Sequence, residues 1–190
     1  MGVDRFSPPL TSLSRLEKKP GGLHNGLKPL ANVGILYPST TRTVSNPQVY
    51  MNYFGWCNAL TDGQISYNVL MERDLTPGRL GGYDVLVLPN ASALSNAQTR
   101  QIRRFVNAGG TLIATGKTSL YDETGARRSD FGLSETLGVS YVSDVASPHT
   151  ILSSTKSLVG QSLGESFANE TEHVKVRVTS ASLRVLAQAR

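Results

Sequence analysis

A strand–helix–strand pattern between residues 83 and 116 constrains the fold more than any other part of this sequence. Residues 85–88 are a continuous apolar run, which is typical of a parallel strand covered on both faces. Ser95 or Asn96 can cap the helix that follows, and Gly109-Gly110 ends it, because glycine accepts the left-handed backbone conformation. Residues 112–114 then begin a second buried strand. The pattern predicts a parallel α/β sheet, with any ligand site at the carboxyl ends of its strands.

The neighbouring segments extend this alternation of strands and helices. Three further strands are predicted, over residues 32–37, 65–71 and 139–142. Residues 39–46 are expected to form a polar loop, and a helix to begin at Pro47 behind an Asn46 cap. Right-handed crossovers between these strands predict the sheet order 2-1-3-4-5, with helices on both faces.

Composition along the chain predicts three regions. Residues 1–30 are rich in Pro, Gly, Ser and Lys without a sustained period, and we expect an arm or linker there. Residues 31–145 are predicted to form the α/β domain. Residues 146–190 are predicted to be an irregular and β-rich extension that completes or flanks the sheet. In this extension, residues 174–178 alternate Val with Lys and Arg, as in a strand with one solvated face, and 183–187 are a further predicted strand.

Charge and cysteine content exclude several classes of function. The net charge is +5, but the basic residues are scattered, so nucleic acid is not a predicted partner. No apolar run approaches the ~20 residues of a membrane span. Residues 1–5 lack the apolar core of a signal peptide, so we expect a cytoplasmic protein with no membrane partner. Cys57 is the only cysteine, which excludes an internal disulfide and a multi-cysteine metal site, and no metal or cofactor is predicted.

Two short features suggest catalysis, and a structural role is the preferred interpretation of both. Gly116-Lys117-Thr118 is similar to the end of a phosphate-binding loop. However, five residues separate Gly110 from Gly116 where that loop has four, and most of them belong to a predicted strand. Cys57 shares one face of a predicted helix with aromatic residues, where burial disfavours the reactive thiolate.

A series of short motifs runs through residues 32–142: Tyr53-Phe54-Gly55-Trp56, Asp74-Leu75-Thr76, Tyr83-Asp84-Val85-Leu86-Val87-Leu88-Pro89-Asn90, Leu94-Ser95, Phe105-Val106, Gly109-Gly110 and Thr118-Ser119-Leu120-Tyr121-Asp122. Together these motifs resemble the β-galactosidase trimerisation-type domain of bacterial glycoside hydrolases. In those enzymes the domain follows a catalytic (β/α)₈ barrel.

The resemblance implies a flavodoxin-like parallel sheet with helices on both faces, similar to class I glutamine amidotransferases, and a short β-rich C-terminal tail. The amidotransferase nucleophile is a cysteine at a strand-end elbow, whereas the turn here is Ala114-Thr115-Gly116. The hydrolytic carboxylates of the glycosidases belong to the barrel, for which this chain has no room. The resemblance therefore favours a protein that is not an enzyme. A fragment, a truncated gene product and a stand-alone relative all remain open.

Two functions follow from these observations. The first is a non-catalytic accessory or oligomerisation domain, whose partners are further copies of itself or a glycosidase barrel. The alternative is a stand-alone binding protein for a small molecule such as a carbohydrate, or a hydrolase, that uses the strand-end crevice. Six residues are predicted to line that crevice: Tyr37, Arg42, Asn90, Lys117, Thr118 and Asp122.

The aromatic residues of the helix after Pro47 favour self-association. Tyr50, Tyr53, Phe54 and Trp56 spread around more than one face at 3.6 residues per turn. One face can enter the core, and the remainder would leave an exposed apolar patch, which monomers tend to avoid.

Overall fold

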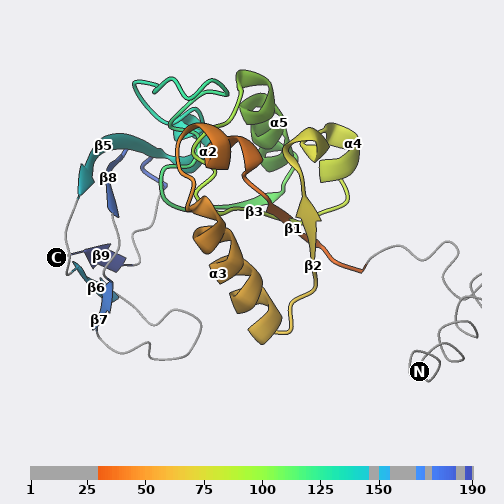
Figure 1. Cartoon of the computed structure of the whole chain (residues 1–190), viewed down its shortest axis with the longest axis horizontal. Coiled ribbons are helices and arrows are strands. Elements are labelled where there is room, and N and C mark those ends of the chain that lie inside the picture. Colours follow the sequence, from red (N-terminus) through yellow and green to blue (C-terminus); the bar gives the residue numbers. More distant parts are fainter. Residues whose placement is uncertain (1–29, 146–149, 155–165, 170–172, 183–186, 190) are drawn as a thin grey trace, which may run out of the picture. The chain divides into compact units, whose positions relative to one another are not determined.

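The computed structural model describes residues 30–145, 150–154, 166–169, 173–182 and 187–189 (Figure 1). The chain divides into two units, Met1–Leu30 and Ala31–Arg190, and all described helices and strands lie in the second. Apart from Leu30, the predicted arm lies outside the described residues.

Four parallel strands form the central sheet in the order β2-β1-β3-β4. Their bounds are β1 Val33–Leu36, β2 Tyr67–Leu70, β3 Val85–Leu88 and β4 Thr111–Ala114. The parallel sheet and the order of its first four strands are thus confirmed. The predicted fifth position is wrong, because β5 (Val139–Val145) pairs with β8 (His173–Val178) in a separate antiparallel ribbon. The sequence of β5 forms a strand but does not specify the edge that it joins.

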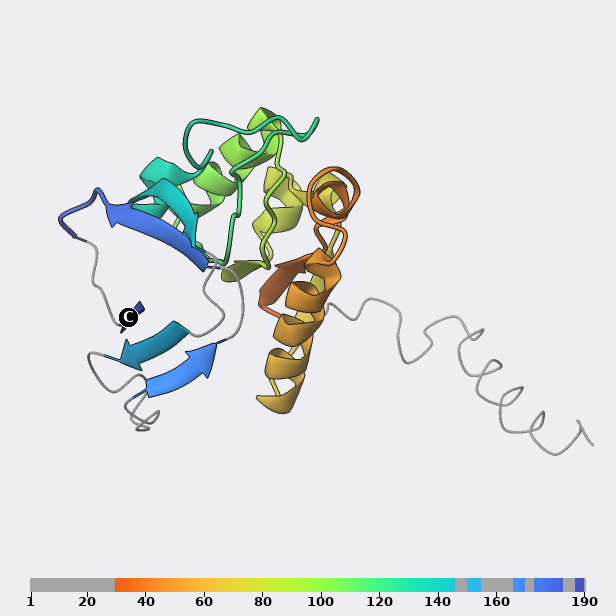
Figure 2. The ribbon, with the colours of Figure 1, turned by 60° about the vertical axis from the view of Figure 1, so that its left-hand side comes forward.

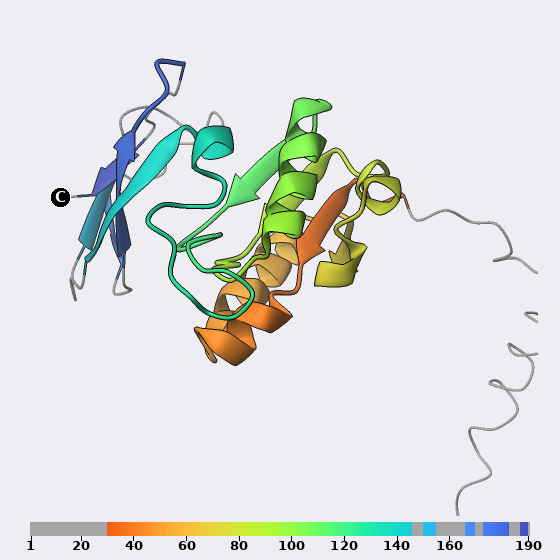
Figure 3. The same ribbon diagram turned by 90° about the horizontal axis from the view of Figure 1, so that it is seen from above.

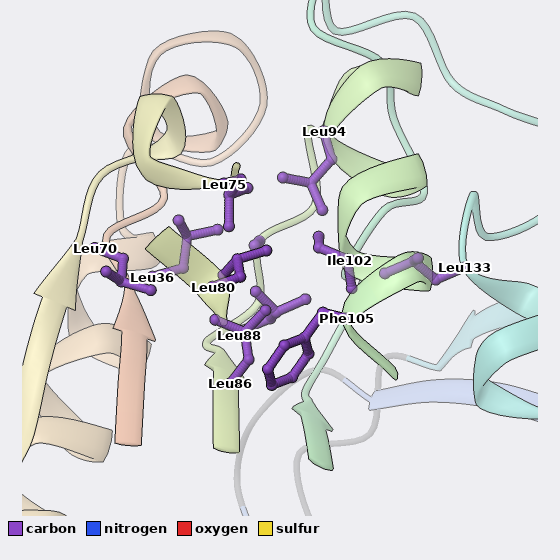
Figure 4. Close-up of a cluster of buried hydrophobic side chains, with 11 residues drawn as sticks. Leu36, Leu70, Leu75, Leu80, Leu86, Leu88, Leu94, Ile102, Phe105 and Leu133 are labelled. Atoms are coloured by element: carbon purple, nitrogen blue, oxygen red, sulfur yellow. The ribbon is translucent and has the colours of Figure 1, made fainter. Parts of the chain in front are cut away.

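Each face of the sheet packs into its own apolar core. Side chains at 86 and 88 of β3 enter one core with α4 (Pro77–Leu80) and α5 (Asn96–Asn107), as Figure 4 shows. Val87 points to the other face, where it meets α3 (Val49–Asp62). Figures 2 and 3 show α3 and α5 on different sides of the sheet. Burial on both faces explains why β3 is a continuous apolar run.

The segment predicted as a polar loop contains a helix, α2 (Ser39–Val44). Ser and Thr are weak helix formers, and tertiary hydrogen bonds compensate here. The amide of Thr40 donates to Glu72 in the short 3-10 helix η1 (Glu72–Asp74) at 2.8 Å, and buried Thr41 accepts from the amide of Ala93 at 2.9 Å. The next helix, α3, begins two residues later than the sequence suggests.

The ends of α5 follow the sequence closely. Ser95 is the N-cap and forms a reciprocal capping box with Gln98, which decides between the two predicted caps. The helix ends at Asn107, and Gly109 adopts φ +100°, a conformation that favours glycine. Gly110 serves a different purpose, since a Cβ there would lie 2.3 Å from the ring of buried Phe105.

Short elements complete the described chain. They are α6 (Ser134–Leu137), β6 (Thr150–Ser154), β7 (Ser166–Asn169) and β9 (Ala187–Ala189). The last three form an antiparallel sheet in the order β7-β6-β9. The strand predicted over 174–178 is confirmed as β8, although Val176 and Val178 are 44% and 45% exposed, so neither face of β8 is fully buried. Residues 183–186 of the last predicted strand lie outside the described residues.

The close approach of Gly110 to the Phe105 ring allows a test of the packing between α5 and β4. Gly110→Ala is expected to lower the free energy of unfolding by about 1–3 kcal/mol, because the added methyl displaces the Phe105 ring. Gly78→Ala in α4 is the matched control, since its Cβ would meet no atom within 4 Å, and a gain of up to about 1 kcal/mol is expected there because alanine favours the helix more than glycine does. Urea denaturation measures both, and equal effects would contradict the close approach at Gly110.

Candidate functional site

The carboxyl ends of β1, β3 and β4 meet at one edge of the sheet because these strands are parallel. Tyr37 follows β1, Asn90 follows β3 and Thr115 follows β4. In open α/β sheets this edge is where ligands bind.

Asn90 joins the ends of β3 and β4. Its backbone N–H donates to Thr115 Oγ1 at 3.1 Å, and its side-chain Oδ1 accepts from the backbone N–H of Lys117 at 2.8 Å. Its Nδ2 donates to Asn52 Oδ1 of α3 at 3.3 Å. The backbone of Asn90 is left-handed (φ +49°), which asparagine tolerates better than most side chains do. One residue thus fixes two strand ends and the first turns of α3.

Thr118 and Ser119 are buried behind this edge, and both hydroxyls serve the backbone. Thr118 Oγ1 donates to the carbonyl of Thr115 at 2.8 Å, and Ser119 Oγ accepts from the amide of Leu133 at 3.1 Å. Ser119 also has φ +66°, a strained conformation for serine. These bonds hold the loop closed, so neither hydroxyl lines an open site.

Asp122 organises its own turn. Its Oδ1 accepts from the hydroxyl of Thr124 at 2.7 Å and from the amides of Thr124 and Ala126, each at 2.9 Å. The hydroxyl of Thr124 is the main cause that holds the pKa of Asp122 below its ordinary value. This carboxylate is therefore committed to loop structure.

Tyr37, Arg42 and Cys57 lie on the side of the strand ends that α2 and α3 cover. Arg42 Nη1 donates to Tyr37 Oη at 2.9 Å, and the Tyr37 ring meets Tyr53 edge-on at a centroid distance of 5.2 Å. Burial raises the pKa of the Tyr53 hydroxyl. Cys57, next to Tyr53, packs against the core on the α3 side of the sheet. These contacts describe a packed aromatic cluster.

A hollow of about 860 Å³ opens between the strand ends, the first turns of α3 and strand β8. Polar but uncharged side chains dominate its lining: Ser45, Asn46, Gln48, Asn52, Asn90, Ser92, Thr115, Tyr121 and His173, with Gly116, Lys117, Met51, Val174 and Val176. A hollow of this size suits a small-molecule ligand.

Lys117 connects the strand ends to the ribbon. Its Nζ donates to Asp144 Oδ2 of β5 at 2.8 Å. The ribbon is held at further points, because Asp130 Oδ1 accepts from the amide of Tyr141 at 2.8 Å and the Tyr141 ring meets Phe131 edge-on at 5.8 Å.

The structure brings only two of the six predicted crevice residues into this hollow, Asn90 and Lys117. Tyr37, Arg42, Thr118 and Asp122 lie outside its lining. Asn46 and Gln48, which precede α3, Asn52 in its first turn and His173 also line the hollow and were not predicted from the sequence. The signal for the first three was available, since amide side chains gather around the predicted start of a helix that follows β1.

Within the described residues, no group of three or more His, Cys, Asp or Glu side chains is placed to hold a metal ion. None of the helices that the structure describes has the length and apolar character needed to cross a bilayer.

Comparison with known proteins places the chain in context. A family model described as "Beta-galactosidase trimerisation domain" matches residues 39–151, more than half of the chain. No curated protein sequence matches the chain.

Several solved enzymes share the fold. A β-galactosidase from Bacillus circulans sp. alkalophilus has 17% identity and a TM-score of 0.71, over 87% of this chain and 25% of that one. A β-galactosidase from the Antarctic haloarchaeon Halorubrum lacusprofundi has 12% identity and a TM-score of 0.67, over 84% and 24%. An α-L-fucosidase from Paenibacillus thiaminolyticus has 19% identity and a TM-score of 0.66, over 93% and 25%. The chain thus spans about a quarter of the length of these enzymes.

The Lys117–Asp144 pair predicts a defined dependence on pH. The hydrogen bond from Lys117 is the main cause that holds the pKa of Asp144 below its ordinary value. A lowered carboxyl pKa stabilises the fold above the pKa of the unfolded chain, and this stabilisation is lost as the pH falls through the folded value. Lys117→Met is therefore expected to raise the pKa of Asp144. The variant should also lose less than about 1 kcal/mol near pH 7, since both side chains are partly exposed.

Carboxyl NMR titration and urea denaturation at pH 7 and pH 3 measure these two effects. Asp122 is the internal control, because its pKa depends chiefly on Thr124 and should not move. A stability difference that persists undiminished at pH 3 would mean that Lys117 acts through packing and not through its charge.

Proposed function

The chain belongs to the beta-galactosidase trimerisation domain family, and we propose that it is a non-catalytic assembly domain that binds further copies of itself through the outer face of α3. The single observation that carries this proposal is the near absence of charge on that helix. In its 14 residues, α3 has one charged side chain, Asp62, at its last position.

The exposed side of α3 carries large apolar side chains beside the uncharged polar residues Asn52, Asn58 and Thr61. Tyr50, Met51 and Phe54 are 38%, 63% and 53% exposed, and the Tyr50 and Phe54 rings lie edge-on at 6.2 Å. On the other face of the sheet, α5 buries Ile102 and Phe105 and exposes arginine side chains, as a helix facing water does. The contrast within one protein indicates that the outer face of α3 is covered in the working assembly.

Two neighbouring features enlarge this surface. Val69 of the edge strand β2 is 48% exposed and is aligned with Ile35, which packs in the core that α3 covers, so Val69 extends the apolar face. On the other flank of α3, a shallow hollow of about 400 Å³ is lined mainly by Met51, Gly55, Trp56 and Ala59. A partner side chain can fill such a hollow, as anchors do at protein interfaces.

The second contact surface that we propose is the β5–β8 ribbon. A closed three-fold ring is built from heterologous contacts, so the α3 face must meet a different surface on the next copy. Val142 and Val178 of the ribbon are each 45% exposed, and β8 pairs with β5 alone among the described strands. Such an open strand edge readily adds a partner.

A glycosidase barrel is the other partner that we propose, since this chain matches only about a quarter of each enzyme of similar fold. The non-catalytic role is supported by the turn after β4, Thr115-Gly116-Lys117, which has no cysteine, and by the backbone hydrogen bond of the Ser119 hydroxyl. A cytoplasmic location stays a prediction, and the single cysteine is compatible with it.

The second candidate function is carbohydrate binding in the 860 Å³ hollow, which its amide lining favours.

Light scattering at tens of micromolar is expected to give a mass well above the 20.4 kDa of one chain. Tyr50→Lys with Phe54→Lys should return the mass to that of a monomer, because each lysine places a charge in the contact. Val178→Lys should do the same from the ribbon side. Ala97→Lys on the exposed side of α5 is the matched control and should leave the assembly intact.

Mixing tests the heterologous geometry. The α3 double variant and the Val178→Lys variant each keep one intact surface, so an equimolar mixture should form a two-chain species. A monomeric wild-type protein would contradict the assembly role itself. A mixture that stays monomeric would contradict only the pairing of these two surfaces.

A further inference from the structure

We infer that the 860 Å³ hollow binds a neutral sugar, a mono- or disaccharide, through the carboxamides at the start of α3. This inference deepens the second candidate function and does not depend on the assembly role.

Two asparagines in the lining are held by their oxygens and keep their NH₂ groups unpaired. Asn52 Oδ1 accepts from Asn90 Nδ2 at 3.3 Å, and Asn46 Oδ1 accepts from the amide of Gln48 at 3.0 Å. Among the described residues, neither NH₂ group has a partner, and the side chain of Gln48 has none either. Each asparagine is thus oriented by one hydrogen bond and presents donors to the hollow, an arrangement that lowers the entropy cost of binding.

The charge of the hollow favours a neutral ligand. Among the described residues that line the hollow, Lys117 is the one with a formal charge, histidine aside, and its Nζ is paired with Asp144 at 2.8 Å. An anion would have to compete with that carboxylate. Carboxamides both donate and accept, which matches the paired hydroxyls of a sugar better than it matches a phosphate.

The lining also supplies the apolar surface that a sugar ring needs. Val174 and Val176 of β8 and Met51 of α3 line the hollow together with the amides. His173 belongs to the same lining, and its Nε2 is shielded from solvent without a hydrogen-bond partner. A buried polar atom without a partner is destabilising, and a ligand hydroxyl that reached it would remove that cost.

The test is a titration of the full chain with galactose, glucose and lactose, followed through the side-chain NH₂ signals in ¹⁵N NMR spectra. At least one sugar is expected to shift the signals of Asn46, Gln48 and Asn52, with a dissociation constant on the order of millimolar. Gln48→Ala with Asn52→Ala should weaken binding about 10-fold, as expected for the loss of one or two hydrogen bonds. Asn107→Ala, an exposed asparagine at the end of α5, is the matched control and should bind as the wild-type protein does.

Three outcomes would overturn the inference: no sugar shifts these signals, the double variant binds with unchanged affinity, or inorganic phosphate shifts the same signals at lower concentration than any sugar. Both substituted residues are exposed, so backbone signals away from the hollow should stay unchanged and report an intact fold. The titration is repeated on the Tyr50→Lys, Phe54→Lys variant. Sugar binding there with no assembly, or assembly of the wild-type protein with no sugar binding, separates the two proposals.

Discussion

Strand β3 and Asn90, two residues beyond its end, organise this domain. β3 pairs with β1 on one side and β4 on the other, and its side chains enter both cores in alternation. The backbone of Asn90 is left-handed. Its side chain accepts a hydrogen bond from the backbone amide of Lys117 and donates one to the side chain of Asn52. The position of β4, the loop that follows it and the start of α3 all depend on these contacts. Asn90 thereby positions part of the lining of the hollow.

The two helices on opposite faces of the sheet show how a fold separates stability from recognition. α3 buries one face against β1 and β3, and α5 buries one face against the opposite side of β3. These contacts form the two cores. Of the two helices, α5 has the features of a helix whose outer side faces water, a capping box and exposed arginines. The outer side of α3 has no charged side chain before Asp62, its last residue, although the packing of the sheet does not require this. Exposed Tyr50, Met51 and Phe54 on a helix surface without charge favour a partner that covers them.

The sequence predicted the sheet because its signals are local. Continuous apolar runs mark β1 and β3, and glycines mark the end of α5. It failed at α2, whose stability comes from Glu72 and Ala93, which are distant in the chain. Of the six predicted crevice residues, Asn90 and Lys117 line the hollow, and their role in binding stays a prediction. The sequence could not show that Thr118 and Asp122 satisfy their own loops, nor that β8 brings His173 to the hollow, because both depend on tertiary contacts.

Met51 gives the two proposed surfaces a physical connection. It lines the 860 Å³ hollow and also the shallow hollow on the outer flank of α3, and it is 63% exposed. A partner that packs on Met51 fixes one wall of the ligand hollow, and a ligand that packs on Met51 fixes part of the contact surface. Because coupling between two sites is reciprocal, any gain in sugar affinity on assembly equals the gain in assembly on sugar binding. The flexible thioether of methionine can adapt to either neighbour, so the sign of this coupling depends on whether one rotamer serves both.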